Sequence, residues 1–331
     1  MRAELLPLDP AAYEPHALHS AERVWTETNC YVDLWIEVLH ALGLEPTAAG
    51  AFALASDFED DQWTFFKHPA EDLRELYGIE VAEMSVWRPV PDHVEEHLRR
   101  GRLLTVEADA WYLPDTRGVS YGLEHVKTTI VPQMIDNAAH RLGYFHNAGY
   151  YELEGDDFAG ALGLEPRASD RLPPYVELVR LDRLHRSPPG GQGSGCHDLV
   201  GAARSTLQRH LARRPSTNPV ARFASRLEDD LGWLTGAGLD TFHLYAFATC
   251  RQCGAASEVA AAFLSWMGAR DGGGLEVAEQ SLLGLASQAK ALQFALARAA
   301  TGRKVDVSGL LGQMAGSWDV AMTALDERYA C

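Results

Sequence analysis

A short segment rich in glycine, proline and serine, SPPGGQGSG at residues 187–195, divides this sequence into two parts of different character. Before it, short strand-like apolar stretches alternate with amphipathic helical stretches. After it, from His197 to the end, the chain is rich in alanine and its apolar residues recur at helical spacing. Such a composition is typical of a flexible linker or loop, which we place at 187–196. The sequence therefore predicts an α+β domain over residues 1–186 and a domain of four to six helices over residues 197–331.

The overall composition indicates a soluble globular protein. Apolar residues make up 47% of the chain and the mean hydropathy is −0.17, and we find no apolar run long enough to span a bilayer. The N-terminus lacks the basic start and apolar stretch of a signal peptide, and five cysteines, an odd number, favour the reduced thiols of a cytoplasm. A net charge of −17 would repel nucleic acid phosphates. We therefore expect a cytoplasmic protein that binds neither nucleic acid nor membranes.

The strongest chemical signal is a cysteine at the start of a helix. In TETNCYVDLWIEVLHALGLEP, residues 26–46, apolar side chains recur every three or four residues from Tyr31 to Leu42, which predicts an amphipathic helix. Asn29 is a suitable N-cap, so Cys30 takes about the first helical position. The unpaired amides and the positive end of the helix dipole favour a thiolate there. Cys30 is therefore a candidate nucleophile, and the alternative is a small buried cysteine that only fills space.

A thiol nucleophile needs a base, and His125 is the best candidate. It opens the predicted strand HVKTTIVPQMI, and Asn147 ends the following strand. The order of a cysteine on a helix, then a histidine and an asparagine on two later strands, is that of papain-like enzymes. The amide of Cys30, together with Asn29, is a candidate oxyanion hole. The alternative role of Asn29 is helix capping alone.

Two residues are candidates to orient the imidazole of His125. Asn147 fits by its position in the second strand, but a symmetric hairpin would leave it several residues from His125. A β-bulge at Pro132 would correct this offset, because proline cannot donate a hydrogen bond within the sheet. Asp136, at the end of the strand that His125 opens, is a stronger electrostatic partner but lies in a turn. The sequence leaves both open.

Two motifs suggest metal binding but lack the rest of a metal site. HVEEH, from His93 to His97, fits the zinc pattern H-x-x-E-H, yet it is short and polar and no distal ligand is identifiable. Cys250 and Cys253 form a single C-x-x-C without a second pair of ligands nearby. We interpret the first motif as a solvated helix and the second as a buried helical pair. We expect no metal.

Long strings of this sequence resemble a bacterial family, domain of unknown function 1839, over nearly the whole chain. They include HSAERVWTETNCYVDLWIEVLHALGLEP, DFEDDQWTFFKHPAEDLRELYGIEV, GYFHNAGYYEL and FATCRQCGAASEVAAAFLSWM. The resemblance implies that such proteins are often encoded near amino acid:carrier-protein ligases or natural-product genes. The N-terminal half is also similar in layout, through Cys30 and His125, to the papain-like acyltransferase of butirosin biosynthesis (protein H). This second resemblance implies a papain-like domain that moves an aminoacyl group from a carrier-protein thioester to an amine.

The function that we predict is a cysteine acyltransferase of specialised metabolism. His125 would deprotonate Cys30, and the thiolate would attack an acyl or aminoacyl thioester on the phosphopantetheine arm of an acyl or peptidyl carrier protein. An amine or similar small-molecule acceptor would then take the acyl group. The protein would need no cofactor of its own. Two alternatives stay open: hydrolysis by the same pair, as an amidase or thioesterase, and a non-catalytic scaffold that binds a carrier protein or a ligase.

A carrier protein, which is usually acidic, would need a local positive patch on this acidic chain. The densest cluster of cations is the segment QRHLARRPSTNPVARFASR. Its arginines are Arg209, Arg213, Arg214, Arg222 and Arg226. We expect this patch to dock the carrier protein, and the alternative is an ordinary solvated helix face.

Overall fold

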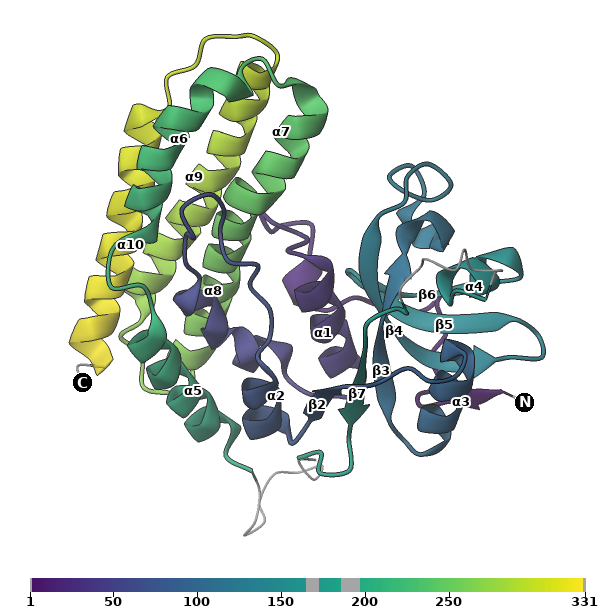
Figure 1. Ribbon diagram of the computed structural model, residues 1–331. Coiled ribbons are helices and arrows are strands. Elements are labelled where there is room, and N and C mark those ends of the chain that lie inside the picture. The colour runs from purple at the N-terminus through teal and green to yellow at the C-terminus, as the bar shows by residue number, and fades with distance from the viewer. Residues whose placement is uncertain (1, 165–172, 186–196, 330–331) are drawn as a thin grey trace. The chain divides into compact units, whose positions relative to one another are not determined.

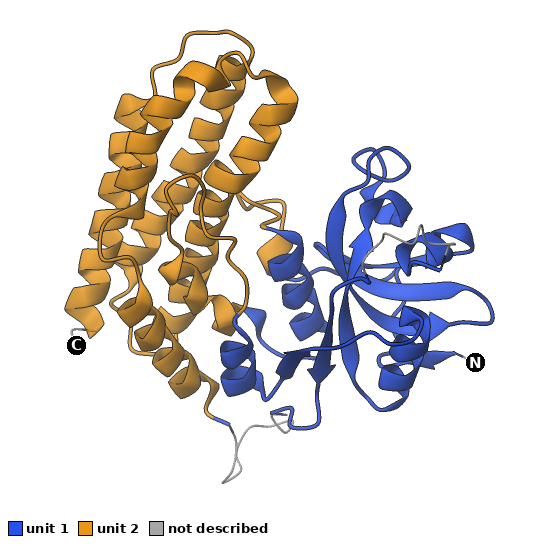
Figure 2. Ribbon diagram, viewed as in Figure 1, with its two compact units in different colours: residues 1–17, 29–46, 69–197 blue, residues 18–28, 47–68, 198–331 orange. Residues whose placement is uncertain are grey.

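The computed structural model describes residues 2–164, 173–185 and 197–329 (Figure 1). The predicted linker at 187–196 lies outside these described residues. The chain forms two compact units (Figure 2). The first comprises residues 1–17, 29–46 and 69–197, and the second comprises residues 18–28, 47–68 and 198–331.

The first unit contains an antiparallel sheet of seven strands. The strands are β1 (Ala3–Glu4), β2 (Glu80–Glu83), β3 (Leu103–Asp109), β4 (Lys127–Asp136), β5 (Arg141–His146), β6 (Gly149–Glu154) and β7 (Val176–Arg180). They are ordered β2-β7-β3-β4-β5-β6, and β1 pairs with β4. The register between β4 and β5 shifts between Pro132 and Met134, so the ladder is irregular beside the proline at which the sequence analysis considered a bulge.

The α-helices of this unit are short and lie between the strands in sequence. They are α1 (Cys30–Ala41), α2 (Ala70–Tyr77), α3 (Val90–Arg99) and α4 (Asp156–Ala161), and the 3₁₀ turns η3 (Ala110–Tyr112) and η4 (Pro114–Thr116) follow β3. The helix α1 packs against β4, β5 and β6, and its apolar face, with Leu34, Trp35 and Leu39, is fully buried. The side chain of Asn29 accepts a hydrogen bond from the amide of Val32, 3.0 Å away. The predicted helix and its cap are therefore confirmed.

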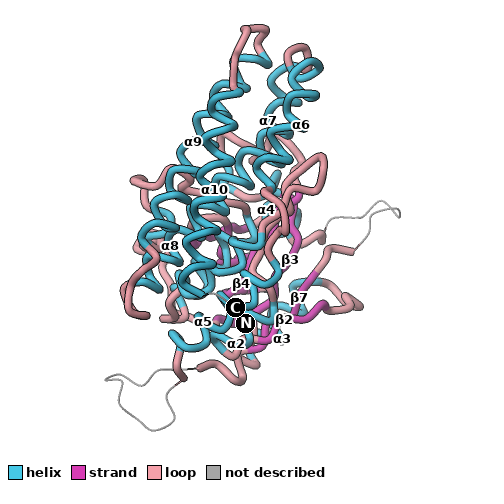
Figure 3. The backbone as a smooth tube through the Cα atoms, turned by 90° about the vertical axis from the view of Figure 1, so that its left-hand side faces the viewer, coloured by secondary structure: helices cyan, strands magenta, loops and turns pink. Residues whose placement is uncertain are grey.

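The second unit is helical. It contains α5 (Leu199–Arg213), α6 (Pro219–Leu234), α7 (Gly238–Ala246), the π-helix η5 (Phe247–Arg251), α8 (Gln252–Gly268), α9 (Glu276–Ala300) and α10 (Ser308–Tyr329). The long helices α9 and α10 pack side by side, and α8 packs on α9 (Figure 3). Small alanine side chains on their facing surfaces, such as Ala286 and Ala289, are fully buried and allow the helices to approach closely. A mixed α+β region followed by a helical region is thus the architecture that the sequence predicted.

Two segments of the N-terminal half belong to the helical unit, although the sequence analysis assigned them to the first domain. The segment 18–28 includes most of the 3₁₀ helix η1 (Ala17–His19), and the segment 47–68 includes most of the 3₁₀ helix η2 (Pro46–Ala55). In the segment 18–28, the buried carboxylate of Glu258 accepts from the amides of Val24 and Trp25, at 3.0 and 2.8 Å. These hydrogen bonds join the segment to α8 inside the helical unit.

None of the helices in the described part of the chain combines the length and the hydropathy that a bilayer span requires.

Candidate active site

Cys30 is the first residue of α1 and is half-buried. Asn29, immediately before it, is buried, and its side-chain oxygen caps the helix through the amide of Val32. The amide of Cys30 belongs to the first turn, whose N–H groups have no partner within the helix. The capping role predicted for Asn29 is therefore confirmed. Its side-chain oxygen serves as the cap, so its side-chain nitrogen is the atom that would donate to an oxyanion.

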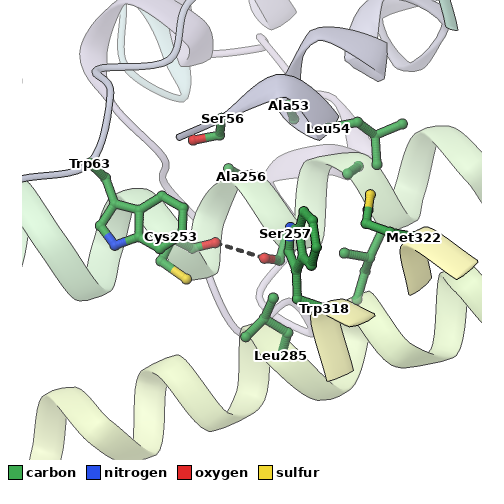
Figure 4. A pocket seen from close by; sticks show the side chains of 12 residues that line it. Ala53, Leu54, Ser56, Trp63, Cys253, Ala256, Ser257, Leu285, Trp318 and Met322 are labelled. Atoms are coloured by element: carbon green, nitrogen blue, oxygen red, sulfur yellow. Dashed lines mark hydrogen bonds between the residues drawn. The ribbon is translucent and has the colours of Figure 1, made fainter. Parts of the chain in front are cut away.

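The two other cysteines in the described ranges are buried. Burial raises the pKa of the Cys250 thiol to about 12 and that of Cys253 further. Cys253 lines a cavity of about 20 Å³ in the helical unit. Figure 4 shows Cys253 among the side chains that line it, which include Trp63 and Leu285. That volume holds about one water molecule, not a substrate. The buried helical pair predicted for these cysteines is confirmed. Of the three cysteines in the described ranges, Cys30 is the one whose thiol is partly accessible to a substrate.

His125 is held by a carboxylate and an indole. It lies two residues before β4 with its Nδ1 2.6 Å from Oδ2 of Asp109, the last residue of β3. Trp111 stacks on the imidazole, with ring centroids 4.5 Å apart and an angle of 13° between the planes. The other oxygen of Asp109 accepts from the amide of Trp111 at 3.1 Å. A neutral imidazole that donates Nδ1–H to Asp109 keeps Nε2 as a proton acceptor, which is the tautomer that a general base requires.

Asp109 thus takes the orienting position for which the sequence suggested Asn147 or Asp136. Asp136 is at the opposite end of β4, a strand of 10 residues, which at about 3.3 Å per residue is about 30 Å long. There it pairs with Arg141 and accepts from backbone amides of the following turn. Asn147 lies in the turn between β5 and β6 with a φ of 45°, a conformation that asparagine tolerates. The β4–β5 register, extended by two residues, places it opposite Thr129, well inside the strand that His125 precedes.

The Asp109–His125 pair lies on the face of the sheet that the start of α1 covers. Glu177 of β7 accepts from the hydroxyls of Tyr31 on α1 and Thr105 on β3, at 2.9 and 2.8 Å. Since alternate residues of a strand point to the same face, Asp109 points to the face of Thr105. Tyr31 directly follows Cys30 in sequence. Among the described residues, however, no hydrogen bond joins the Cys30 sulfur to His125, so the contact predicted between them stays a prediction.

A second aspartate–histidine pair, which the sequence analysis missed, is buried in the sheet. Asp115 in η4 is 2.6 Å from Nδ1 of His146 and accepts from the hydroxyl of Tyr144 at 2.5 Å. Nε2 of His146 is 2.7 Å from the hydroxyl oxygen of Thr128. These side chains tie the segment between Asp109 and the start of β4 to the middle of the sheet. The network of Asp115, Tyr144 and His146 therefore fixes the segment that ends at His125. The only sign of this network in the sequence is the turn-like Pro-Asp-Thr at residues 114–116.

The arginines of the predicted docking patch are largely engaged within the helical unit. Arg214 pairs with Asp326 at 2.7 Å, and Arg222 pairs with Asp57 and donates to a backbone carbonyl. Arg226 is 2.9 Å from Asp230. Arg209 and Arg213 also have partners. Because neighbouring carboxylates neutralise much of this charge, the segment offers less positive potential than its sequence suggests.

The histidine motif forms α3, as predicted, but its first histidine is not solvated. His93 is buried, and its ring and that of His97 stack 6.5 Å apart. Burial lowers the pKa of both histidines. The carboxylate of Glu96, which the zinc pattern would use, pairs with Arg100 instead. Within the described ranges, no three histidine, cysteine or acidic side chains converge on a point that could hold a metal ion.

The fold and the site define a two-unit protein in which a cysteine heads a helix on an antiparallel sheet and an aspartate-held histidine lies on the same face. The chain belongs to the DUF1839 family, because residues 14–181 match the DUF1839 N-terminal domain and residues 197–327 match the DUF1839 C-terminal domain. The family resemblance expected from the sequence is thereby confirmed. No curated protein matches the chain.

Proposed function

We propose that this protein is a cysteine-dependent acyltransferase with a papain-like site in its first unit. The observation that carries the proposal is a half-buried cysteine at a helix start together with His125, whose Nδ1 is held by Asp109 on the sheet face that the same helix covers. A helix start favours the thiolate, and a carboxylate-oriented imidazole is the base that thiol nucleophiles use. The layout of Cys30 and His125, from which the sequence analysis inferred a resemblance to the papain-like butirosin acyltransferase (protein H), would suit the same chemistry.

The mechanism begins with proton transfer. Nε2 of His125 takes the proton of the Cys30 thiol, and the thiolate attacks the carbonyl carbon of an acyl or aminoacyl thioester. The oxyanion of the tetrahedral intermediate accepts from the amide of Cys30 and from the side-chain nitrogen of Asn29. Collapse of the intermediate breaks the old C–S bond, and His125 returns the proton to the departing thiol of the carrier arm. Asp109 keeps the imidazole in the required tautomer and stabilises its protonated form.

The second half transfers the acyl group to the acceptor. An amine attacks the Cys30 thioester, His125 takes a proton from the amine, and the Cys30 sulfur leaves and is reprotonated. The acyl donor would be a carrier protein of specialised metabolism in the cytoplasm, and the acceptor a small amine. Water in place of the amine would make the same site a hydrolase, and a chain in which Cys30 is never acylated would be a scaffold.

Intact-mass analysis tests the proposal. The protein is incubated with a set of aminoacyl carrier proteins and with short N-acetylcysteamine thioesters, with and without an amine. A transferase gives an adduct on wild-type protein that persists in buffer and disappears when an amine is added. A hydrolase gives an adduct that decays in buffer alone.

Two variants identify the roles of the site residues. Cys30→Ser should give no thioester adduct, and His125→Gln should form the adduct far more slowly. If no donor acylates the wild-type protein, or if Cys30→Ser is labelled equally, the acyltransferase proposal is refuted and the scaffold alternative is favoured.

A further inference from the structure

The segment from Arg117 to Val126, which we call the His125 loop, holds apolar side chains in solvent directly before β4. Val119 is 75% exposed and Leu123 is 65% exposed, and Val126 beside His125 is also exposed. By contrast, the apolar residues of β4 that follow are buried. A run of exposed apolar side chains beside a candidate catalytic histidine indicates a surface that contacts another molecule.

The exposure results from an ordered backbone. The carbonyl of Thr116 accepts from the amide of Ser120, and the carbonyl of Ser120 accepts from the amide of Leu123, at 3.0 and 2.9 Å. Gly118 and Gly122 take positive φ angles of 85° and 65°, which allow the tight turns at no steric cost. The loop therefore holds its apolar side chains outward before any ligand binds, which lowers the entropy cost of binding.

Arg117 places a positive charge at the start of the same loop. Its guanidinium lies over the ring of Tyr121, 5.5 Å from the centroid, and the Tyr121 hydroxyl is fixed by Asp157 at 2.8 Å. No carboxylate in the described part of the chain forms an ion pair with Arg117, whereas Lys127 at the other end pairs with Glu107 at 2.8 Å. The guanidinium is therefore available to an anion, and its planar donors suit a phosphate.

We infer that the His125 loop binds the phosphopantetheine arm of a carrier protein, an inference that rests on the proposed function. Arg117 pairs with the phosphate, and Val119 and Leu123 contact the uncharged chain of the arm. His125 is the penultimate residue of the loop, so a ligand that runs along the loop from Arg117 delivers its thioester toward the base. This surface lies in the same unit as Cys30, and it replaces the arginine segment of the helical unit as the docking site.

The charge of the loop favours a carrier-borne arm over free coenzyme A. The arm on a carrier protein has one phosphodiester, and Arg117 is the one arginine or lysine of the loop, which also contains the carboxylate of Glu124. Coenzyme A carries a diphosphate and a further phosphate, and an acidic chain with a net charge of −17 would repel the surplus charge.

Binding experiments on the Cys30→Ala protein test the inference without any reaction. The probes are 4′-phosphopantetheine, pantetheine and coenzyme A, and the readouts are affinity by calorimetry and the amide NMR shifts of the His125 loop. We expect 4′-phosphopantetheine to bind about tenfold more tightly than pantetheine, as one charge-assisted contact implies. Arg117→Ala should abolish this difference. Val119→Ser combined with Leu123→Ser should weaken both probes.

The matched control is Arg183→Ala, which removes another exposed arginine of the same unit. Because the side chains substituted in the loop and at Arg183 are exposed, circular dichroism should show the same fold as the Cys30→Ala parent. The inference is overturned if Arg117→Ala binds 4′-phosphopantetheine as tightly as the parent protein does, if the shifts lie outside the loop, or if coenzyme A binds more tightly than 4′-phosphopantetheine. Failure of the proposed function gives a different result, in which the affinities follow Arg117 but no thioester acylates Cys30 of the wild-type protein.

Discussion

Replacing Asp109 by alanine should slow the acylation of Cys30 about tenfold without unfolding the protein. Asp109 is 2.6 Å from Nδ1 of His125, and the two side chains are 31% and 58% exposed. A buried hydrogen bond to a charged group contributes about 1.5–3 kcal/mol, and solvent screening at this exposure favours the lower end. Since about 1.4 kcal/mol corresponds to a factor of ten in rate, a loss of about tenfold follows if the whole interaction acts in the transition state. Asp109→Asn should also slow acylation, because the two oxygens of Asp109 face Nδ1 of His125 and the amide of Trp111, and the NH₂ of asparagine cannot accept from either.

The chain offers a matched control on the same strand. Glu107 lies two residues before Asp109, on the same face of β3, with a 30% exposed carboxylate that pairs with Lys127. Glu107→Gln removes a comparable charge without touching His125. The assay is single-turnover acylation by a short aminoacyl thioester, followed by mass spectrometry at several pH values. Equal rates for Asp109→Ala and Glu107→Gln would show that the Asp109 carboxylate acts only through its charge, and a wild-type rate for Asp109→Ala would refute the orienting role.

The other predictions concern reactivity and stability. Cys30 should be the described thiol that iodoacetamide labels fastest near neutral pH, and labelling of Cys250 in native protein at a similar rate would contradict this. Glu258→Gln should lower the free energy of unfolding by about 2 kcal/mol, because the NH₂ of glutamine then faces one of the two backbone N–H groups that donate to the carboxylate. An unchanged midpoint of unfolding in urea would show that these hydrogen bonds do not stabilise the fold. His146→Leu should cost about 3 kcal/mol, since it removes the imidazole that faces the buried carboxylate of Asp115 and leaves that carboxylate with the Tyr144 hydroxyl alone, and a loss below about 1 kcal/mol, as an exposed pair contributes, would show that the site is solvated. Burial and the neighbouring aspartate raise the pKa of Tyr144 well above 10, so the folded state keeps a phenolic proton that the unfolded state loses above about pH 10; the contribution of Tyr144 to stability should therefore be constant below that pH and fall above it, and Tyr144→Phe should reduce the loss of stability above about pH 10.

The parts of the site that depend on local sequence could be predicted. The spacing of apolar residues and the capping asparagine determine α1, and both are properties of adjacent residues, so Cys30 was placed correctly at its first turn. The irregularity beside Pro132 was also predictable, because proline lacks the N–H that the ladder needs. In each case the physical cause lies within a few residues of its effect.

The partner of His125 depends on strand pairing, which the sequence does not reveal. Asp109 meets His125 because β3 and β4 are antiparallel neighbours, with Asp109 opposite Lys127. The residues from η3 to the end of the His125 loop form the connection between these strands. Because this connection is long, the local sequence pattern does not show which residues of the two strands pair. The second pair, Asp115 and His146, escaped prediction for the same reason, since its members come from η4 and β5.

The helical unit resumes at Asp198, shortly after the composition change at residues 187–195, but it also includes two segments from the N-terminal half of the chain. The segment 18–28 precedes the first helix of the α+β unit, yet its amides at Val24 and Trp25 are satisfied by the carboxylate of Glu258 in the helical unit. The indole nitrogen of Trp25 likewise donates to the carbonyl of Ala286 at 3.0 Å. A buried carboxylate that accepts two backbone amides is costly to separate from them, because each side would be left with unpaired polar groups. A chain cut after the first sequence domain would therefore lose the partners of the segment that leads into Cys30. For this reason the helical C-terminal domain is expected to be required for a reactive Cys30, even though every candidate catalytic residue lies in the first unit.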